Sequence, residues 1–167
     1  MIGISGMDIT PADRRAVMKA LCSGRLALGP AAAAFEQACA RAAGLRHGVA
    51  VSSGTAGLHA LVQAFGIGHG DEVITTPYSF VASANCVLFE HAAVRFVDID
   101  PVTWNLDTAH LAAAVSRKTR AILPVHVFGL PYDHAGVSRV ARRHGLPVLE
   151  DACEALGATW HSRPAGS

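Results

Sequence analysis

Short apolar runs alternate along this sequence with longer stretches whose apolar residues recur at helical spacing. Five of the runs are rich in Val or Ile and predict strands, and the stretch after each one predicts a helix. Because parallel strands need long crossover connections, this alternation favours an α/β three-layer sandwich with a mostly parallel sheet. The predicted strands are 48–51, 72–75, 94–98, 120–125 and 147–150, and the predicted helices start near Thr55, Ser79, Thr108, Asp133 and Ala152.

Two further helices are predicted before the sheet begins. Thr10-Pro11 combines a capping residue with a proline suited to the first helical position, which predicts a helix over 11–21. A second predicted helix covers 31–43. We therefore divide the chain into an N-terminal helical arm, residues 1–30, and a sheet-containing domain, residues 31–167.

The composition is typical of a domain with a buried core. Of the 167 residues, 51% are hydrophobic and 16% charged, which argues against disorder. The net charge of +1 gives no electrostatic basis for binding nucleic acid. No apolar stretch approaches the ~20 residues of a membrane span, and no signal peptide is evident. We expect a cytoplasmic protein without nucleic-acid or membrane partners.

The cysteines and histidines show no metal-binding pattern. No C-x-x-C pair is present, and the nine histidines are scattered. We therefore expect neither a zinc site nor a disulfide framework, and buried free thiols at Cys22, Cys39, Cys86 and Cys153.

Polar and small residues gather directly after the predicted strands. Open α/β sheets bind their ligands beyond the carboxyl ends of the strands, so a binding site is expected there. The segments concerned are 52–55, 77–80, 98–100, His126 and Asp151.

The first of these segments, Ser52-Ser53-Gly54-Thr55-Ala56-Gly57, lies between a predicted strand and a predicted helix. Small residues let the backbone approach a ligand closely, and the free amides of a helix start favour an anion such as phosphate. A simpler interpretation is that Gly54-Thr55 only makes the turn and caps the helix. The segment matches neither a Walker loop nor the dinucleotide fingerprint.

An acidic pair, Glu150-Asp151, ends the last apolar run. Since a carboxylate is costly to bury unpaired, one at this position usually faces a helix start or a cationic ligand atom. Asp151 could equally cap a following helix. Glu154 lies about one helical turn further on and could face the same point.

Two aromatic side chains after predicted strands also have structural explanations. Phe80 is either a core residue or a flat wall for a ring, and His126 is either a satisfied capping histidine or a catalytic one. A helix start, an aromatic wall and a carboxylate together suit a ligand with a phosphate, an aromatic ring and a basic ring nitrogen. Pyridoxal 5'-phosphate has all three, because a carboxylate beside its pyridine nitrogen keeps that nitrogen protonated.

Five strings of this sequence resemble, in order, motifs of the DegT/DnrJ/StrS family of sugar aminotransferases, which are fold type I enzymes that use pyridoxal phosphate. The match runs from about Gly29 to Ser167, and Phe35-Glu36 is similar to the family's lead-in. The strings are AVSSGTAGL at 50–58, GDEVITTP at 70–77, FVDID at 96–100, PVHVFG at 124–129 and EDACEALGA at 150–158.

The resemblance implies a fold and a set of partners. Residues 31–167 would be the N-terminal part of the pyridoxal-phosphate-binding large domain, without the rest of that domain and the small C-terminal domain. The family's site lies between two subunits, which implies a homodimer. The implied substrates are a nucleotide-linked keto-sugar and an amino donor such as glutamate.

The resemblance also implies roles for individual residues. Phe80 would stack on the pyridine ring, Asp151 would pair with the ring nitrogen, and Glu154 would sit near the 3'-hydroxyl. Many family members have Gln or His in place of Glu154. The cofactor phosphate would be met by Gly54, Thr55 and Ala56.

The family's Schiff-base lysine has no counterpart in this sequence. Lys19 and Lys118 stand at other positions, and we expect both to be solvated surface residues. In the family the chain continues past a segment like 157–167 to that lysine. The resemblance therefore implies an N-terminal fragment with no catalytic residue of its own and no measurable transamination alone.

Other hypotheses stay open. In a branch of the family a histidine replaces the lysine and the reaction is a dehydration. The chain could also be a non-catalytic or inactive α/β fragment that at most binds cofactor or a partner. An unrelated nucleotide-binding domain is disfavoured because neither phosphate-binding fingerprint is present.

Overall fold

A three-stranded parallel sheet lies at the centre of the chain. The computed structural model describes residues 6–25 and 27–167. The strands β1 (Glu72–Thr75), β2 (Ala93–Phe96) and β3 (Thr119–Leu123) lie in the order β2-β1-β3, and both pairings are parallel.

Segment 147–151 extends this sheet beside β3. The Leu149 amide donates to the Ile122 carbonyl at 2.9 Å, and the Asp151 amide donates to the Pro124 carbonyl at 3.0 Å. Parallel bridges join the same two segments. Four of the five predicted strands are therefore confirmed as members of one parallel sheet.

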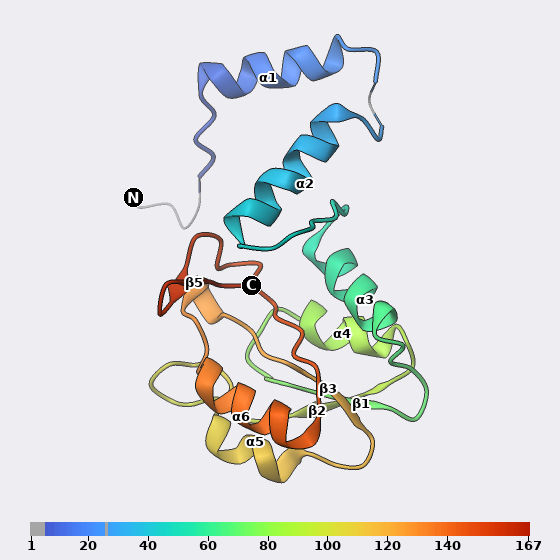
Figure 1. Cartoon of the computed structure of the whole chain (residues 1–167), viewed down its shortest axis with the longest axis vertical. Coiled ribbons are helices and arrows are strands. Elements are labelled where there is room, and N and C mark those ends of the chain that lie inside the picture. The colour runs from blue at the N-terminus through green and yellow to red at the C-terminus, as the bar shows by residue number, and fades with distance from the viewer. Residues whose placement is uncertain (1–5, 26) are drawn as a thin grey trace.

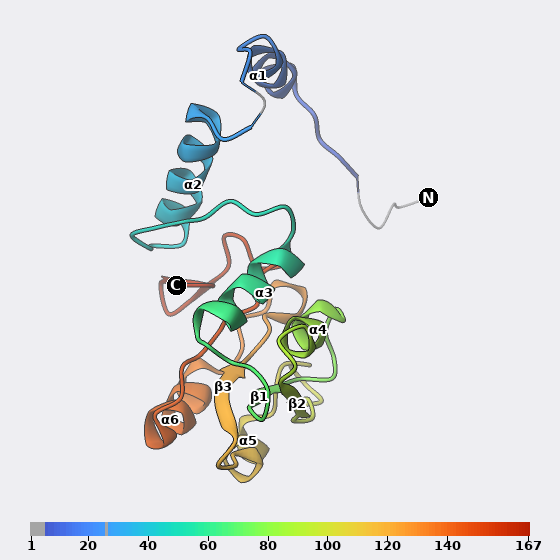
Figure 2. The ribbon, with the colours of Figure 1, turned by 90° about the vertical axis from the view of Figure 1, so that its right-hand side faces the viewer.

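Helices cover both faces of the sheet (Figures 1 and 2). The helices α3 (Gly54–Ala64) and α4 (Ala82–Leu88) pack on one face, and α5 (Thr108–Ala114) and α6 (His134–His144) pack on the other. This confirms the predicted three-layer α/β sandwich.

Side chains alternate between the two faces along each strand. Val73 and Leu123 pack with α3 and α4, whereas Ile74 and Ile122 pack with α5 and α6. All four are fully buried. Burial on both faces explains why the strands read as continuous apolar runs.

Short polar side chains fix where the helices start. The Ser53 hydroxyl accepts a hydrogen bond from the Ala56 amide at 3.1 Å and caps α3. The carboxylates of Asp107 and Asp133 cap α5 and α6 in the same way. At its other end α6 stops at Gly145, whose φ of +65° suits glycine.

Two helices precede the sheet and extend away from it (Figures 1 and 2). The helix α1 (Pro11–Leu21) begins with a reciprocal cap between Thr10 and Asp13, and none of its residues is buried. In α2 (Pro30–Ala42) only Ala40 is buried. The two predicted N-terminal helices are confirmed.

Three predicted elements differ from the structure. Residues 48–51 form no strand and have no regular secondary structure. They lie against α2, where the Ala50 amide donates to the Glu36 carboxylate at 2.9 Å. The helix expected near Ser79 begins at Ala82. No helix follows Ala152, because the chain turns there and reaches Gly157 with a φ of +84°.

The remaining elements are short. A single 3-10 turn, η1 (Val127–Gly129), follows β3, and β4 (Thr159–Trp160) pairs antiparallel with β5 (Arg163–Pro164). No helix in the described part of the chain is long and apolar enough to cross a membrane.

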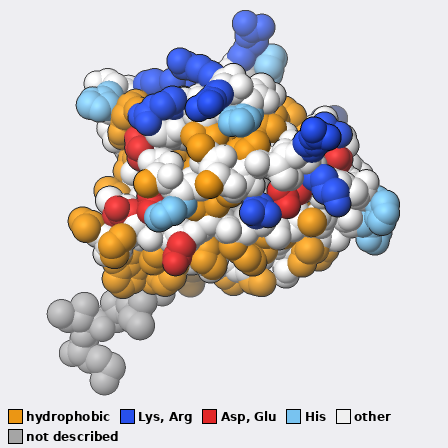
Figure 3. Space-filling model, turned by 90° about the horizontal axis from the view of Figure 1, so that it is seen from below, with side chains coloured by type: hydrophobic (Ala, Val, Ile, Leu, Met, Phe, Trp, Pro, Cys, Tyr) orange, Lys and Arg blue, Asp and Glu red, His pale blue; other side chains and the backbone are white. Residues whose placement is uncertain are grey.

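Large hydrophobic side chains are prominent on the surface, and Figure 3 shows broad areas of hydrophobic side chains on one face, beside groups of Lys and Arg. Val49, Phe80 and Leu156 are each at least three-quarters exposed. So much exposed apolar surface is typical of a face that packs against another chain or another part of the same chain.

We predict that Ile122→Val lowers the free energy of unfolding by about 1 kcal/mol, because Ile122 is fully buried and the variant leaves a methyl-sized cavity. Val102, which is 86% exposed, provides the control. Val102→Ala should change the same quantity by less than about 0.5 kcal/mol. Urea unfolding followed by circular dichroism measures both free energies. Equal losses for Ile122→Val and Val102→Ala would contradict the burial of β3 in the core.

Candidate functional site

A pocket of about 550 Å³ opens where the strands end, on the α3 and α4 side of the sheet. Its size is ordinary for a small-molecule site. Segments far apart in the sequence form its walls: the start of α3, the loop before α4, the end of β3 with η1, and the turn after segment 147–151. The lining residues are Gly54, Thr55, Leu58, Pro77, Tyr78, Ser79, Phe80, Ala82, Val125, Val127, Phe128, Asp151, Cys153 and Glu154.

The start of α3 presents backbone amides to this pocket. Ser53 caps the helix through the Ala56 amide, whereas the Gly54 and Thr55 amides have no hydrogen-bond acceptor within the described residues. The alternative that Gly54-Thr55 itself caps the helix is wrong, since Ser53 does so. Two free amides at a helix start are suited to an anion.

Gly54 also lies in close contact with the turn after Asp151. A Cβ atom at Gly54 would stand 2.6 Å from the Cys153 sulfur. Only a residue without a side chain lets the start of α3 and this turn come so close. The small residue therefore brings the two walls of the pocket together.

Asp151 is the buried carboxylate of the pocket, with 6% of its surface exposed. Its Oδ2 accepts a hydrogen bond from the Ser83 hydroxyl at 2.7 Å, and its Oδ1 accepts one from the Cys153 amide at 3.2 Å. The Ser79 hydroxyl lies 2.7 Å from that of Ser83 and continues the network. Asp151 does not cap a helix, and the carboxylate is held in place from two sides.

Aromatic side chains form the outer wall. Phe80 is 75% exposed, so its interpretation as a core residue is wrong. Tyr78 lines the pocket beside it and makes edge contacts with the rings of Trp104 and Phe128. An exposed phenyl ring at the mouth of a pocket is available to a planar ligand.

Glu154 lines the pocket and is anchored to the turn after β3. Its Oε2 accepts a hydrogen bond from the Phe128 amide at 2.9 Å. Its carbonyl lies 3.0 Å from where a Cβ of Gly129 would stand, and Gly129 has a φ of +82°. These contacts hold η1 against the turn that carries Glu154.

The thiols near Asp151 are poor nucleophiles. Burial first, and then the negative charge of Asp151, raises the pKa of the Cys86 thiol to about 11. Partial burial of its sulfur, and then the hydrogen bond to and the charge of Asp151, raise the pKa of the Cys153 thiol to about 11 as well, although the residue as a whole is exposed. Both stay protonated near neutral pH. The expectation of buried thiols holds for Cys86 and is wrong for Cys22, Cys39 and Cys153, which are exposed.

His126 lies outside the pocket. It is fully buried, and its Nε2 is 3.0 Å from the Glu150 carboxylate on the opposite side of the sheet. Its Nδ1 has no hydrogen-bond partner in the described structure, so it is not the fully satisfied histidine of the structural interpretation. Lys19 and Lys118 are exposed, as expected, and neither lines the pocket.

Comparison with known proteins identifies the family. The model of the DegT/DnrJ/EryC1/StrS aminotransferase family matches residues 7–167. The chain belongs to this family. The predicted resemblance is confirmed, and the match begins nearer the N-terminus than Gly29.

Two relatives identified by sequence agree with this membership. The chain is 40% identical over 159 residues to a "Pleiotropic regulatory protein" of Geobacillus stearothermophilus, covering 95% of this chain and 43% of the relative. It is 47% identical over 133 residues to a GDP-perosamine synthase of Caulobacter vibrioides, covering 80% and 36%. The chain thus spans less than half the length of these relatives.

A solved structure shares the fold over the whole chain. The putative sugar aminotransferase Spr1654 of Streptococcus pneumoniae, in its PMP form, superimposes with a TM-score of 0.95 at 27% identity. The superposition covers 100% of this chain and 46% of that one. The chain therefore has the fold of part of a family aminotransferase.

Several residues that line the pocket or contact its lining residues were not singled out from the sequence. Ser83, which holds Asp151, is a polar residue within the mostly apolar run Ala82–Leu88, and this pattern could have indicated it. Tyr78 stands in the segment expected to follow a strand, but nothing separated it from Phe80. The contact of Cys153 with Gly54 joins residues almost a hundred positions apart and leaves no trace in local sequence.

We predict that Gly54→Ala lowers the free energy of unfolding by about 1–3 kcal/mol, because the new methyl group meets the Cys153 sulfur. Adding Cys153→Ala should recover most of the loss, since it removes that sulfur. Denaturant unfolding of the two single variants and the double variant measures the coupling. Additive effects would show that the two residues do not touch.

Proposed function

We propose that this chain forms the cofactor-binding part of a pyridoxal-phosphate-dependent aminotransferase that acts on a nucleotide-linked keto-sugar. The observation that carries the proposal is the buried Asp151 carboxylate, which faces a pocket that also contains a free helix start and an exposed phenyl ring. Family membership and the name of the GDP-perosamine synthase relative support the reaction class and the sugar substrate.

The pocket residues fit pyridoxal phosphate. The free amides of Gly54 and Thr55 would receive the phosphate, whereas the Ala56 amide is already held by Ser53 and would contribute only after a rearrangement. Phe80 would lie against the pyridine ring. Glu154 would stand near the 3'-hydroxyl, with its other oxygen anchored to the Phe128 amide.

Asp151 would hold a proton at the pyridine nitrogen. A buried carboxylate close to that nitrogen favours the protonated ring, because the ion pair lies where water screens it little. Ser83 and the Cys153 amide keep the carboxylate oriented. When bound, the cofactor supplies an electron sink for the amino group's carbon, and the protonated nitrogen is what makes the ring effective.

The amine that would attach the cofactor is not supplied by this pocket. Neither Lys19 nor Lys118 is among its lining residues. We therefore propose that the Schiff-base residue lies outside these 167 residues. A histidine at that position would make the enzyme a dehydratase instead.

The surroundings of the pocket suggest how the chain is used. We propose that residues 1–30 form an arm and residues 31–167 part of a larger cofactor-binding domain that works as a homodimer in the cytoplasm. Glutamate or a similar amino acid would be the donor. The exposed Phe80 and Val49 are consistent with a covering partner surface.

Pyridoxamine 5'-phosphate tests the pocket directly, because it carries the ring and phosphate but needs no lysine. We predict that Asp151→Asn weakens its binding by roughly ten- to a hundredfold, since a charged hydrogen bond worth about 1.5–3 kcal/mol is lost. Asp98→Asn is the matched control, because Asp98 follows β2, is exposed and does not line the pocket. Ligand fluorescence measures both. Equal affinities for the two variants would remove Asp151 from the proposed site.

We further predict that residues 1–167 alone do not transfer an amino group from glutamate to a keto-sugar nucleotide, because no lysine reaches the pocket. A coupled assay for 2-oxoglutarate measures the transfer. Borohydride reduction in the presence of pyridoxal phosphate, followed by peptide mapping, provides the control. Turnover, or saturable labelling of Lys19 or Lys118 alone, would contradict the prediction.

A further inference from the structure

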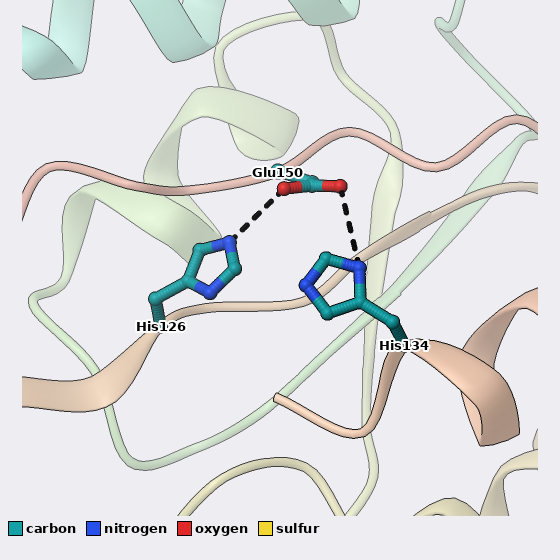
Figure 4. A group of neighbouring side chains, drawn as sticks. All are labelled: His126, His134 and Glu150. Carbon is teal, nitrogen blue, oxygen red and sulfur yellow. Dashed lines mark hydrogen bonds and ion pairs between the residues drawn. The ribbon is translucent and has the colours of Figure 1, made fainter. Parts of the chain in front are cut away.

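A second group of chemically active side chains lies on the other face of the sheet. His126, His134 and Glu150 point toward one another between the end of β3, the start of α6 and segment 147–151 (Figure 4). None of the three lines the proposed cofactor pocket. The residues next to them in sequence, Val125, Val127 and Asp151, do line it. Alternation along the strands sends these neighbours to opposite faces.

Each of the two imidazoles in this group has one buried ring nitrogen without a hydrogen-bond partner in the described part of the chain. His126 is fully buried, and only its Nε2 is engaged, with Glu150. The His134 side chain is 15% exposed, and its ring makes no hydrogen bond in the described part of the chain. His126 Nδ1 and His134 Nε2 are buried without a partner. Buried polar atoms of this kind usually have a protein, water or ion partner.

The His126–Glu150 contact is a hydrogen bond, whereas the position of His134 beside this pair leaves room for a shared cation. His134 Nδ1 lies 3.9 Å from Glu150 Oε1, which is too far for a hydrogen bond. His126 Nε2 lies 3.0 Å from Glu150 Oε2, and one ligand atom from each residue falls within 4.8 Å of the others. Two ligands of a tetrahedral zinc ion stand roughly 3.4 Å apart, as follows from zinc–ligand distances of about 2.0–2.1 Å.

We propose that His126, His134 and Glu150 bind a divalent transition-metal ion of the zinc type. Two imidazoles and one carboxylate are a common three-residue set for such ions, with a fourth position left for water. The two separations involve different oxygens of Glu150, so the carboxylate would bind the ion through both oxygens or rotate to present one of them. The site is independent of the proposed cofactor pocket, so it can hold or fail without affecting that proposal.

The residues around the three ligands support this assignment. The Tyr132 hydroxyl donates to Glu150 Oε1 and the Gly166 amide donates to Glu150 Oε2, each at 2.9 Å. The His134 ring is stacked between Tyr132 and Trp160, with centroids 4.0 and 5.0 Å away. Outer contacts of this kind orient metal ligands and are part of their affinity.

A surface hollow of about 520 Å³ beside His134 gives an ion a route to the site. Arg139, Arg142 and Arg163 also line it, and their positive charge opposes a cation. We therefore expect weaker binding than in closed four-ligand zinc sites. The same charges predict that removing one of them strengthens binding.

The bound ion would act as a structural staple. It would join β3 through His126, α6 through His134 and segment 147–151 through Glu150, while the Gly166 amide on Glu150 ties in the end of the described chain. Because ion binding favours the folded state, the melting temperature should rise with ion concentration.

Cobalt(II) tests the proposal on the tag-free chain, because a protein site of low symmetry gives it visible absorption that zinc then quenches by displacement. We expect saturable absorption with one ion per chain, and a zinc-dependent rise in melting temperature. His134→Gln should weaken binding at least tenfold. His144→Gln is the matched control, since His144 is exposed at the far end of the same helix and should leave binding unchanged.

Two further variants separate a built site from chance binding. Tyr132→Phe should weaken binding by roughly tenfold by releasing Glu150, and Arg142→Gln should strengthen it. Circular dichroism confirms that each variant is folded, and the melting shift gives a second measure of binding. The proposal is overturned if the wild-type chain binds no cobalt, or if His134→Gln and His144→Gln bind it equally.

Discussion

The pairing of segment 147–151 with β3 is the constraint on which the rest of the structure depends. Four backbone hydrogen bonds set its register, and from that register the alternation of side chains follows. Asp151 then faces α3 and α4, and Glu150 faces α5 and α6. A shift of one residue would turn each of the two carboxylates to the opposite face of the sheet. One short segment thus supplies the acidic group of the two proposed sites.

The pocket also depends on close approach between α3 and the turn after Asp151. Gly54 allows this approach, and the amides of Gly54 and Thr55 stay free because Ser53 caps the helix through Ala56. The start of α3 is therefore capped, and two of its amides remain available for the proposed phosphate contact. Aromatic rings at the rim add apolar surface without closing the entrance.

The sequence was sufficient to predict the layered fold, because strands buried on both faces are continuous apolar runs and their helices carry recognisable caps. It also placed Gly54, Thr55, Phe80, Asp151 and Glu154 at one edge of the sheet, and all five line the pocket. Ala56 does not line it. Residues 48–51 were predicted to be a strand because they are apolar, and this was wrong. Local propensity cannot show that the segment lies against α2 and not beside another strand.

Other features depend on contacts between distant segments and could not be predicted locally. The interactions of Ser83 with Asp151 and of His134 with Glu150 join elements that only the tertiary fold brings together. His134 was not singled out because its spacing from His126 matches no metal motif. In both cases the chemistry is visible only once the register of the sheet is known.

The distance along the chain between the walls of the pocket has a consequence for folding. Gly54 and Asp151 are almost a hundred residues apart, and the parallel sheet between them forms through several long crossovers. Such non-local contacts form late, because the entropy of closing long loops must be overcome first. A partly folded or nascent chain therefore lacks the pocket. The proposed cofactor binding would require, and so would indicate, complete folding of this sheet.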